Sequence, residues 1–322
     1  MNIVEISFFV CTNLFFYVRM YYQYFFDEKG NVHMAKKRFG DRKDARKLRT
    51  IDPMSVVSPY IMGTRSGCQN ILQDSFDTEE CEIYLTDKKK EGYKGLSLMH
   101  IIIASYVRTV SQYPAINRYI AGQRVYSRDK IVVSLVIKRE MKLESPDTAI
   151  KVEFSPSDTL FDVYEKFNKA IEDYRNNPGG AFDKLAKTLN YFPGLLLKFA
   201  IGTLRFMDYF GWLPYSLQKL SPFHASLFVT SMGSLGIPAV CHHLYDFGNL
   251  PVFIAFGAKK KVNVINDDGK VEKRGIVDTT FMLDERICDG YYFATAYKYL
   301  KRFFKNPALL ELPPETIVED ID

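Results

Sequence analysis

Two short stretches of this chain combine residue types that can move protons in catalysis. The first, HHLYDFG, places His242 and His243 side by side, with Asp246 and a glycine close behind. The second, DERICDG, places Glu285 four residues ahead of Asp289. An imidazole, with a pKa of about 6.5, can act as a general base near neutral pH, whereas a carboxylate of about 4.3 is a weaker base. Whether either stretch forms a reaction centre depends on the elements that hold it.

From residue 50 onward the chain alternates helical and extended patterns without a linker rich in proline, glycine or serine. Apolar residues recur at the helical period over 97–114 and 159–175, and Ser157 or Asp158 is placed to cap the second helix. β-Branched and aromatic runs predict strands over 130–140, 226–232, 252–257, 261–265 and 276–283. NDDG (266–269) predicts a hairpin turn, and 291–304 a final helix. The alternation favours one α/β (α+β) domain over 51–313.

A strongly apolar segment at about 181–220 interrupts this alternation. On a helix from Leu195 to Phe210, Lys198, Arg205 and Asp208 fall on one narrow stripe and the remaining surface is apolar. We expect the core or a subunit interface to cover this wide arc. The alternatives are a membrane surface against residues 195–212 or a lid over a substrate channel.

Composition and charge limit the classes of function. The 322 residues are 47% hydrophobic and 25% charged, as in an ordinary globular protein, and the net charge is only +5. No stretch interleaves basic and aromatic residues as a nucleic-acid platform would, so the basic run at 34–50 is interpreted as a solvated arm rather than a nucleic-acid or phospholipid patch. Five cysteines without a C-x-x-C pair argue against a disulfide framework and a zinc site. We therefore expect no metal and a cytoplasmic location.

The two ends of the chain differ from the rest in composition. Residues 1–33 are apolar and aromatic over a length that permits a membrane anchor, without the basic start and small-residue cleavage site of a secretory signal. The alternative is that translation starts at Met34, and in either case we expect these residues outside the fold. Residues 314–322 form an acidic tail.

Three segments in the second half of the chain carry a resemblance to known enzymes: SLFVTSMGSLGI, PVFIAFGAKKK and FMLDERICDGYYFATAYKYLKRFFKNPALL. Together with the helix and strand of residues 97–140, they resemble, in order and spacing, the catalytic domain of dihydrolipoyl acyltransferases. These are the core subunits of 2-oxo acid dehydrogenase complexes and are related to the chloramphenicol acetyltransferases. The resemblance implies a chloramphenicol acetyltransferase-like two-layer sandwich with a mixed sheet, which assembles into trimers.

The resemblance also locates the reaction centre. DERICDG is similar to the family's D-H-R-x-x-D-G motif, so Glu285 stands at the position of the catalytic histidine, and HHLYDFG is a lookalike. In the family that histidine takes a proton from a thiol, for which a carboxylate is a poor base unless a dry site raises its pKa. Glu285 is therefore either a tuned base or an ordinary solvated carboxylate.

A second part of the site follows from SLFVTSMGSLGI. Thr230 aligns with the family's serine that donates a hydrogen bond to the oxyanion, although threonine is also common in strands for β-propensity alone. Ser231 is the next candidate for that donor. Ser231 and Gly233 are assigned to binding of coenzyme A.

The resemblance leaves the partners of Asp289 open. In the family this residue orders the loop through an ion pair with an N-terminal arginine, for which Arg46, Arg49 and Arg65 are the candidates. Asp289 would also serve as the cap of the final helix. Because the family's site forms between subunits, His243 could supply the missing base across a subunit boundary, or it could be an ordinary loop histidine.

We expect a CoA-dependent acyltransferase of this family, with acyl-CoA as substrate and a homotrimer as the assembly. The alternative is a catalytically inactive trimeric relative that binds acyl-CoA or a protein partner. The chain has no lipoyl domain, lysine hairpin or Ala/Pro-rich tether, so no covalent lipoyl group is expected.

Overall fold

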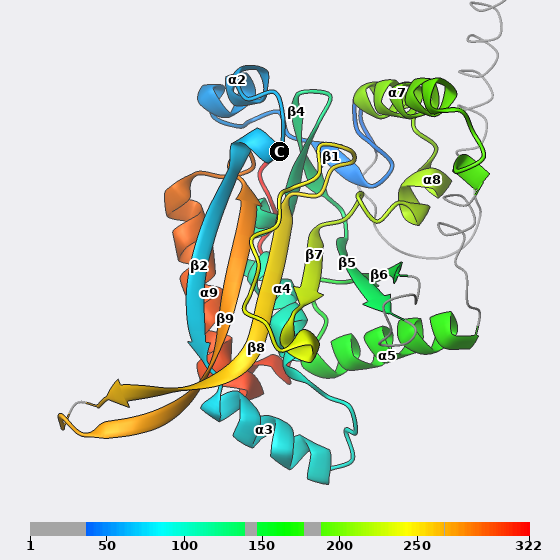
Figure 1. Ribbon diagram of the computed structural model, residues 1–322. Coiled ribbons are helices and arrows are strands. Elements are labelled where there is room, and N and C mark those ends of the chain that lie inside the picture. Colours follow the sequence, from blue (N-terminus) through cyan, green and yellow to red (C-terminus); the bar gives the residue numbers. More distant parts are fainter. Residues whose placement is uncertain (1–36, 139–146, 177–187, 267) are drawn as a thin grey trace, which may run out of the picture. The chain divides into compact units, whose positions relative to one another are not determined.

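The computed structural model describes residues 37–138, 147–176, 188–266 and 268–322. They form one compact unit over Arg38–Asp322 (Figure 1). The expectations for residues 1–33 fall outside the described residues.

A six-stranded mixed sheet is the framework of the unit, with the strand order β2-β9-β8-β7-β5-β6. β7 runs parallel to both β5 and β8, and the other neighbours are antiparallel. The strands are β2 (Gln69–Asp77), β5 (Ile131–Lys138), β6 (Asp147–Phe154), β7 (Leu227–Ser231), β8 (Val252–Ile265) and β9 (Val271–Asp284). The strands predicted over 130–140, 226–232 and 276–283 are confirmed.

One face of this sheet carries a layer of helices. The layer consists of α3 (Glu79–Lys90), α4 (Leu98–Gln112), α5 (Leu160–Asn176) and α9 (Gly290–Lys305). Apolar side chains from all four helices share one buried cluster with sheet residues such as Val229, Ile254 and Phe281. Short 3-10 turns follow α4 and α9, at η2 (Pro114–Asn117) and η4 (Pro307–Leu310). The predicted two-layer sandwich with a mixed sheet is therefore confirmed.

Among the described residues, irregular chain packs on the middle of the opposite face of the sheet. Side chains alternate along a strand, so Phe228, Phe253 and Met282 point away from the helical layer. They pack with Leu244 of the loop between η3 (Gly233–Leu235) and β8. That loop contains HHLYDFG.

The helix predicted over 159–175 is α5, but its cap is Thr159 rather than Ser157 or Asp158. The Thr159 hydroxyl accepts a hydrogen bond from Asp162 N at 3.2 Å, and Thr159 N donates to the Asp162 carboxylate at 2.8 Å. This reciprocal arrangement satisfies two groups at the helix start, whereas Asp158 accepts from Ser155 N in the preceding turn.

Residues 38–50 are part of the fold, so the prediction of a solvated arm is wrong for them. β1 (Ala45–Lys47) pairs with β4 (Arg124–Arg128), which also pairs with β3 (Arg118–Ala121), in a second, three-stranded sheet. Ala45 and Leu48 are buried. α2 (Pro53–Ile61) and η1 (Ser66–Cys68) lead from this sheet to β2.

The acidic tail docks on the same region because its charges complement those of the basic segment. Asp322 pairs with Arg38 and, at 3.2 Å, with Arg46. The Asp320 carboxylate accepts a hydrogen bond of 2.8 Å from Arg118 Nε. A run of basic residues in the sequence was thus matched by acids almost 300 residues away, which local patterns do not reveal.

β8 and β9 continue past the rest of the sheet as a two-stranded ribbon (Figure 1). The strands expected separately over 252–257 and 261–265 form one strand, β8, with an irregularity between Phe256 and Lys259. The predicted hairpin connection between β8 and β9 is confirmed by their antiparallel pairing.

The apolar segment contains α7 (Gly194–Phe210) and α8 (Tyr215–Leu220). Among the described residues, neither the core nor another element covers the outer face of α7, since Leu195 and Phe199 are 86% and 72% exposed. Within the described ranges, no helix is both long and apolar enough to cross a membrane.

Candidate functional site

The corner between β9 and α9 contains DERICDG, the segment in which the sequence resemblance predicts the reaction centre. β9 ends at Asp284 and α9 begins at Gly290. Glu285 extends the pairing with β2 by one step, because its N–H donates to Cys68 O at 2.9 Å. Its side chain is exposed and makes no hydrogen bond or ion pair within the described part of the chain. Glu285 is thus held firmly by its backbone while its carboxylate remains in solvent.

Asp284, directly before it, has the opposite environment. Its carboxylate is fully buried and accepts two hydrogen bonds of 2.7 Å from Nε and Nη2 of Arg286. A second guanidinium, that of Arg65, lies 3.4 Å away. Burial disfavours both cations: it lowers the pKa of Arg65, whereas for Arg286 the bonds to Asp284 outweigh burial and raise the pKa. The three groups form a buried, charge-paired network.

This network fixes the corner to three other segments. Arg65 donates to the carbonyls of Tyr245, Gly248 and Ile120 at 2.8, 3.0 and 2.9 Å. Arg286 donates to Met62 O at 2.8 Å. Asp284 therefore has a structural role, and the charge available for chemistry at the corner is that of Glu285.

Asp289 caps α9, accepting a hydrogen bond from Tyr292 N at 2.8 Å. None of the three candidate arginines pairs with it in the described structure. Arg46 binds Asp322, Arg49 binds Asp41 at 2.9 Å, and Arg65 binds Asp284. Of the two interpretations of Asp289, the helix cap is the one that the structure shows.

The thiol at the corner is not an alternative nucleophile. Burial raises the pKa of Cys288 to about 12, so it is protonated at neutral pH. Among the described residues, no group of three or more histidine, cysteine or acidic side chains is arranged to hold a metal ion.

Thr230 lies near the end of β7, half-buried, on the sheet face that carries Phe228. Its hydroxyl has no hydrogen-bond partner among the residues that the structure describes. Ser231 accepts a hydrogen bond from Gly233 N at 3.3 Å, so its hydroxyl shapes the following turn. The N–H groups of the turn from Met232 to Gly236 mostly donate within the protein, so the donor that Thr230 offers to an oxyanion or a carbonyl oxygen is its own hydroxyl.

Thr230 and Glu285 do not meet within one protomer. The sheet register places Thr230 level with Ala255 and Thr280. Glu285 follows Thr280 by five residues on β9, about 16 Å along the strand, and β9 is two strands away from β7. Within one chain the two groups therefore cannot contact the same thioester carbonyl.

HHLYDFG is a structural loop with one exposed histidine. Asp246 accepts two hydrogen bonds of 2.9 Å from Ser66, from its N–H and from its hydroxyl. His242 stacks on Phe253 with ring centres 4.4 Å apart, and burial lowers its pKa. His243 is exposed and packs edge-on against Tyr245. The carboxylate of this motif is thus already bound by Ser66.

The same loop nevertheless brings His243 to the end of the sheet where Glu285 lies. Leu244 N donates to Oε1 of Gln69 at 2.8 Å, and Gln69 pairs in register with Asp284. The structure therefore gathers His243 and Glu285 at one end of the sheet and leaves Thr230 toward the other.

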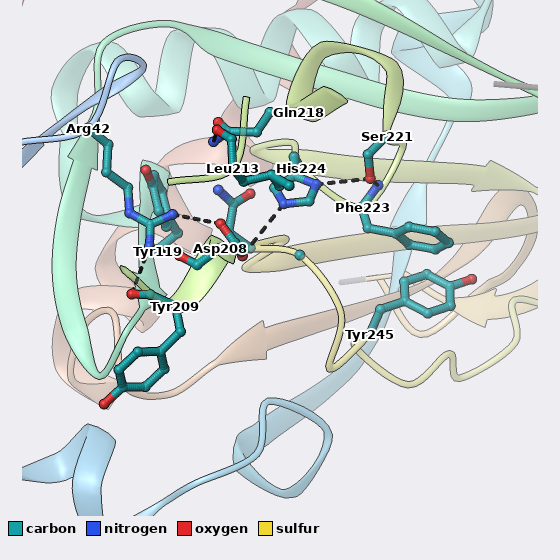
Figure 2. A network of polar contacts seen from close by, with 12 residues as sticks. Arg42, Tyr119, Asp208, Tyr209, Leu213, Gln218, Ser221, Phe223, His224 and Tyr245 are labelled. Atoms are coloured by element: carbon teal, nitrogen blue, oxygen red, sulfur yellow. Dashed lines mark hydrogen bonds and ion pairs between the residues drawn. The ribbon is translucent and has the colours of Figure 1, made fainter. Parts of the chain in front are cut away.

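Sequence patterns missed a second buried polar network, shown in Figure 2. Arg42 Nη1 lies 2.7 Å from Asp208, whose other oxygen lies 3.6 Å from His224 Nε2. His224 Nδ1 is 2.9 Å from the Ser221 hydroxyl. Burial on its own raises the pKa of Asp208, but His224 and Arg42 lower it to about 2. The signal in the sequence was Asp208 itself, the one acidic residue of an apolar helix.

Although this network contains serine, histidine and aspartate, it does not form a nucleophilic site. Ser221 and His224 are buried, three residues apart in one turn, and the Ser221 hydroxyl also accepts from Phe223 N at 3.3 Å. Burial lowers the pKa of His224, against the opposing effect of Asp208. The network holds α7 to the domain, since Arg42 also binds the Asp208 and Tyr209 carbonyls.

Comparisons with known proteins support the fold. No protein-family model and no curated protein sequence matches the chain. Among solved structures, it is similar to a probable dihydrolipoamide acetyltransferase from Listeria monocytogenes, with 14% identity, a TM-score of 0.51 and coverage of 83% of this chain and 96% of that one. The dihydrolipoamide acetyltransferase of Azotobacter vinelandii gives 13% identity, a TM-score of 0.54 and coverage of 89% and 100%. In that protein a serine, a histidine and an asparagine have been investigated for their role in the catalytic mechanism.

A chloramphenicol acetyltransferase is also similar, at 11% identity and a TM-score of 0.49, over 81% of this chain and 99% of that one. At these identities the likeness concerns the arrangement of helices and strands. The chain accordingly has the fold of the catalytic cores of dihydrolipoamide acetyltransferases.

Proposed function

We propose that this chain binds an acyl thioester of the acyl-CoA class between the protomers of a homotrimer, without transferring the acyl group by general-base catalysis. The observation that carries the proposal is the environment of Glu285. The sequence resemblance assigns Glu285 to the position of the base that acyl transfer needs, and its carboxylate is exposed.

A glutamate in place of a histidine matters here because the two side chains differ in their ability to take a proton from a thiol. A thiol has a pKa of about 8.5, close enough to an imidazole of about 6.5 for efficient proton transfer, whereas a carboxylate lies near 4.3. Enzymes that use a carboxylate as base for a weak acid bury it, because desolvation strengthens it. The protomer leaves Glu285 exposed and places the buried charges on Asp284 and its two arginines.

The binding function is supported by the groups that remain. Thr230 offers an unpaired hydroxyl beside the turn of Ser231 and Gly233, which suits the carbonyl oxygen of a thioester. Because Thr230 and Glu285 face different ends of the sheet, a thioester that contacts both must lie between protomers. This is the reason for coupling the proposed site to a trimer.

A second candidate is slow acyl transfer with Glu285 and His243 as a shared base. It is favoured by the loop that holds exposed His243 at the same end of the sheet as Glu285. In this case a partner protomer would have to cover Glu285 and exclude water from it.

Binding is tested by titrating acetyl-CoA into the full chain in a calorimeter. We expect saturable binding to the wild type and at least tenfold weaker binding to Thr230→Val, which keeps the shape and removes the hydroxyl. Ser66→Ala, which alters a hydroxyl bound to Asp246 far from Thr230 in the chain, is the matched control. An absence of binding by the wild type would refute the proposal.

A second experiment tests whether the absence of a histidine at position 285 prevents acyl transfer. Replacing Glu285 by histidine restores the residue type that the thiol requires, so Glu285→His should transfer or hydrolyse acetyl-CoA faster than the wild type. A Glu285→His variant that binds acetyl-CoA like the wild type and remains inert would show that the defect lies elsewhere in the site.

A further inference from the structure

The outward face of α7 is an apolar surface that none of the described residues covers. Leu195, Phe199, Phe206 and Phe210 are 86%, 72%, 56% and 50% exposed. With 3.6 residues per turn, these four side chains fall on one side of the helix. The opposite side, with Leu204 and neighbouring residues, is partly buried against the domain.

The orientation of this face is fixed. Asp208 points inward, where it is largely buried and is paired with Arg42 and His224 (Figure 2). The Tyr209 hydroxyl donates to Gln123 at 2.6 Å and holds the same end of the helix. Rotating α7 to hide its aromatic side would expel Asp208 from its partners and leave Arg42 buried without a counter-ion, which is costly.

The charges of α7 are distributed unequally between its two sides. Asp208, its single acidic residue, is buried and paired. Lys198 and Arg205 are exposed, and because they are seven residues apart they share one edge of the apolar face. The surface that α7 offers is therefore apolar with a cationic edge and carries no acidic side chain.

Aromatic residues extend this surface past the end of the helix. Trp212 is 52% exposed and stacks on Phe210 with ring centres 5.0 Å apart. Tyr191, before the helix, is 88% exposed. Tryptophan and tyrosine are preferred at the boundary between lipid headgroups and acyl chains.

We propose that α7 and Trp212 form a docking surface for an anionic lipid bilayer. The helix lies in the plane of the interface, its four apolar side chains enter the boundary of the acyl chains, and Lys198 and Arg205 contact anionic headgroups. α7 has 17 residues and attaches to the bilayer without crossing it.

The charges of α7 favour an anionic bilayer over a second copy of the chain as the partner of this surface. Two α7 faces related by a twofold axis would each contribute Lys198 and Arg205 to the interface, without an acidic side chain on either face to pair with them. Anionic headgroups supply the negative charge that α7 does not offer to Lys198 and Arg205.

Trp212 is the single tryptophan of the chain and thus reports directly on this surface. Its emission is measured for the full chain with vesicles of phosphatidylcholine alone and with vesicles of phosphatidylcholine and phosphatidylserine. We expect a blue shift and quenching by brominated lipid with the anionic vesicles, and much weaker effects with the neutral ones. Cosedimentation of the protein with the vesicles gives the bound fraction.

Variants identify the side chains responsible. Phe199→Glu with Phe206→Glu should lower the bound fraction at least tenfold, and Lys198→Glu with Arg205→Glu should remove the preference for phosphatidylserine. Ile83→Glu, on an exposed apolar side chain of α3, is the matched control and should bind like the wild type. Circular dichroism confirms that each variant is folded.

Two results would overturn the proposal. The first is that the Phe199/Phe206 variant cosediments with vesicles as fully as the wild type and vesicles leave the Trp212 emission unchanged. In that case α7 is not the surface that contacts the membrane. A blue shift of Trp212 that depends on protein concentration in the absence of vesicles, abolished by the same variant, would make a second copy the occupant. Neither result depends on acyl-CoA binding.

Discussion

Glu285 follows Asp284 directly, yet the first carboxylate is exposed and the second is fully buried between Arg65 and Arg286. The reversal of side-chain direction along a strand explains the difference. Burial alone would make a carboxylate more basic, but the buried residue is neutralised by two cations and the residue at the catalytic position is not buried. A carboxylate base would have to be buried and to lie at the catalytic position. Here Asp284 meets the first requirement and Glu285 the second.

Removing the charge of Asp284 should destabilise the fold. Asp284→Asn leaves two buried guanidinium groups without their counter-ion, and breaking a buried ion pair in this way costs about 3–5 kcal/mol. Urea unfolding measures the change in the free energy of unfolding. The matched control is Glu285→Gln, one residue away and exposed, for which we expect less than about 0.5 kcal/mol. Equal effects of the two substitutions would contradict the assignment of a structural role to Asp284.

The contribution of Asp208 to stability should fall in acid. Its pKa is about 2 in the folded protein, against 3.8 for the ordinary group. A carboxyl with a lowered pKa stabilises the fold at pH values above the unfolded pKa, and this contribution is lost as the pH falls toward the folded pKa. Between pH 5 and pH 3 the stability gap between the wild type and Asp208→Asn should narrow by about 1 kcal/mol. A gap that is constant over this range would show that Asp208 is not held as a charged group.

His100 should make the fold sensitive to mildly acidic pH. It is buried in the first turn of α4, where it accepts a hydrogen bond from Ser97 N at 3.1 Å, and burial lowers its pKa to about 4. Because the unfolded chain binds the proton more readily, stability is lost as the pH falls from about 6.5 toward 4. From pH 7 to pH 5 this amounts to about 2 kcal/mol.

His100→Gln is the matched variant, since glutamine can accept the same hydrogen bond at the helix start without titrating. Unfolding in urea at the two pH values should show a smaller loss for the variant than for the wild type. If both lose the same free energy, the pH dependence belongs to other groups.

The proposed site requires assembly. Light scattering coupled to size-exclusion chromatography, in mild detergent to shield α7, should give a particle of three chains of 37.2 kDa each. A monomer that still binds acetyl-CoA with wild-type affinity would contradict a site between protomers.

Periodic elements could be predicted from the sequence because their signal is local. α4, α5, α9 and the central strands of the sheet fall where apolar spacing placed them. β2 was not predicted: its residues QNILQDSFD are mostly polar, because this edge strand is exposed along much of its length. The basic segment was misinterpreted because Asp322, which pairs with its Arg38 and Arg46, lies at the other end of the chain.

In the candidate site, too, local features could be predicted from the sequence and long-range contacts could not. The position of Glu285 and the cap formed by Asp289 follow from local motifs and a resemblance. The pairing of Asp284 with Arg65 and of Asp208 with Arg42 depends on the folding of distant segments, which residue spacing does not encode. The unmatched apolar arc of α7 was visible in the sequence, but which side of the helix faced the domain depended on the ion pair of Asp208.

The most direct test compares the turnover of acetyl-CoA by the wild type and by Glu285→Gln, with dihydrolipoamide or water as acceptor. Glutamine keeps the size of the side chain and cannot take a proton, so our account predicts the same background rate for both proteins. A wild-type rate that falls tenfold or more in Glu285→Gln, with acetyl-CoA binding unchanged, would establish Glu285 as a working base and contradict the account.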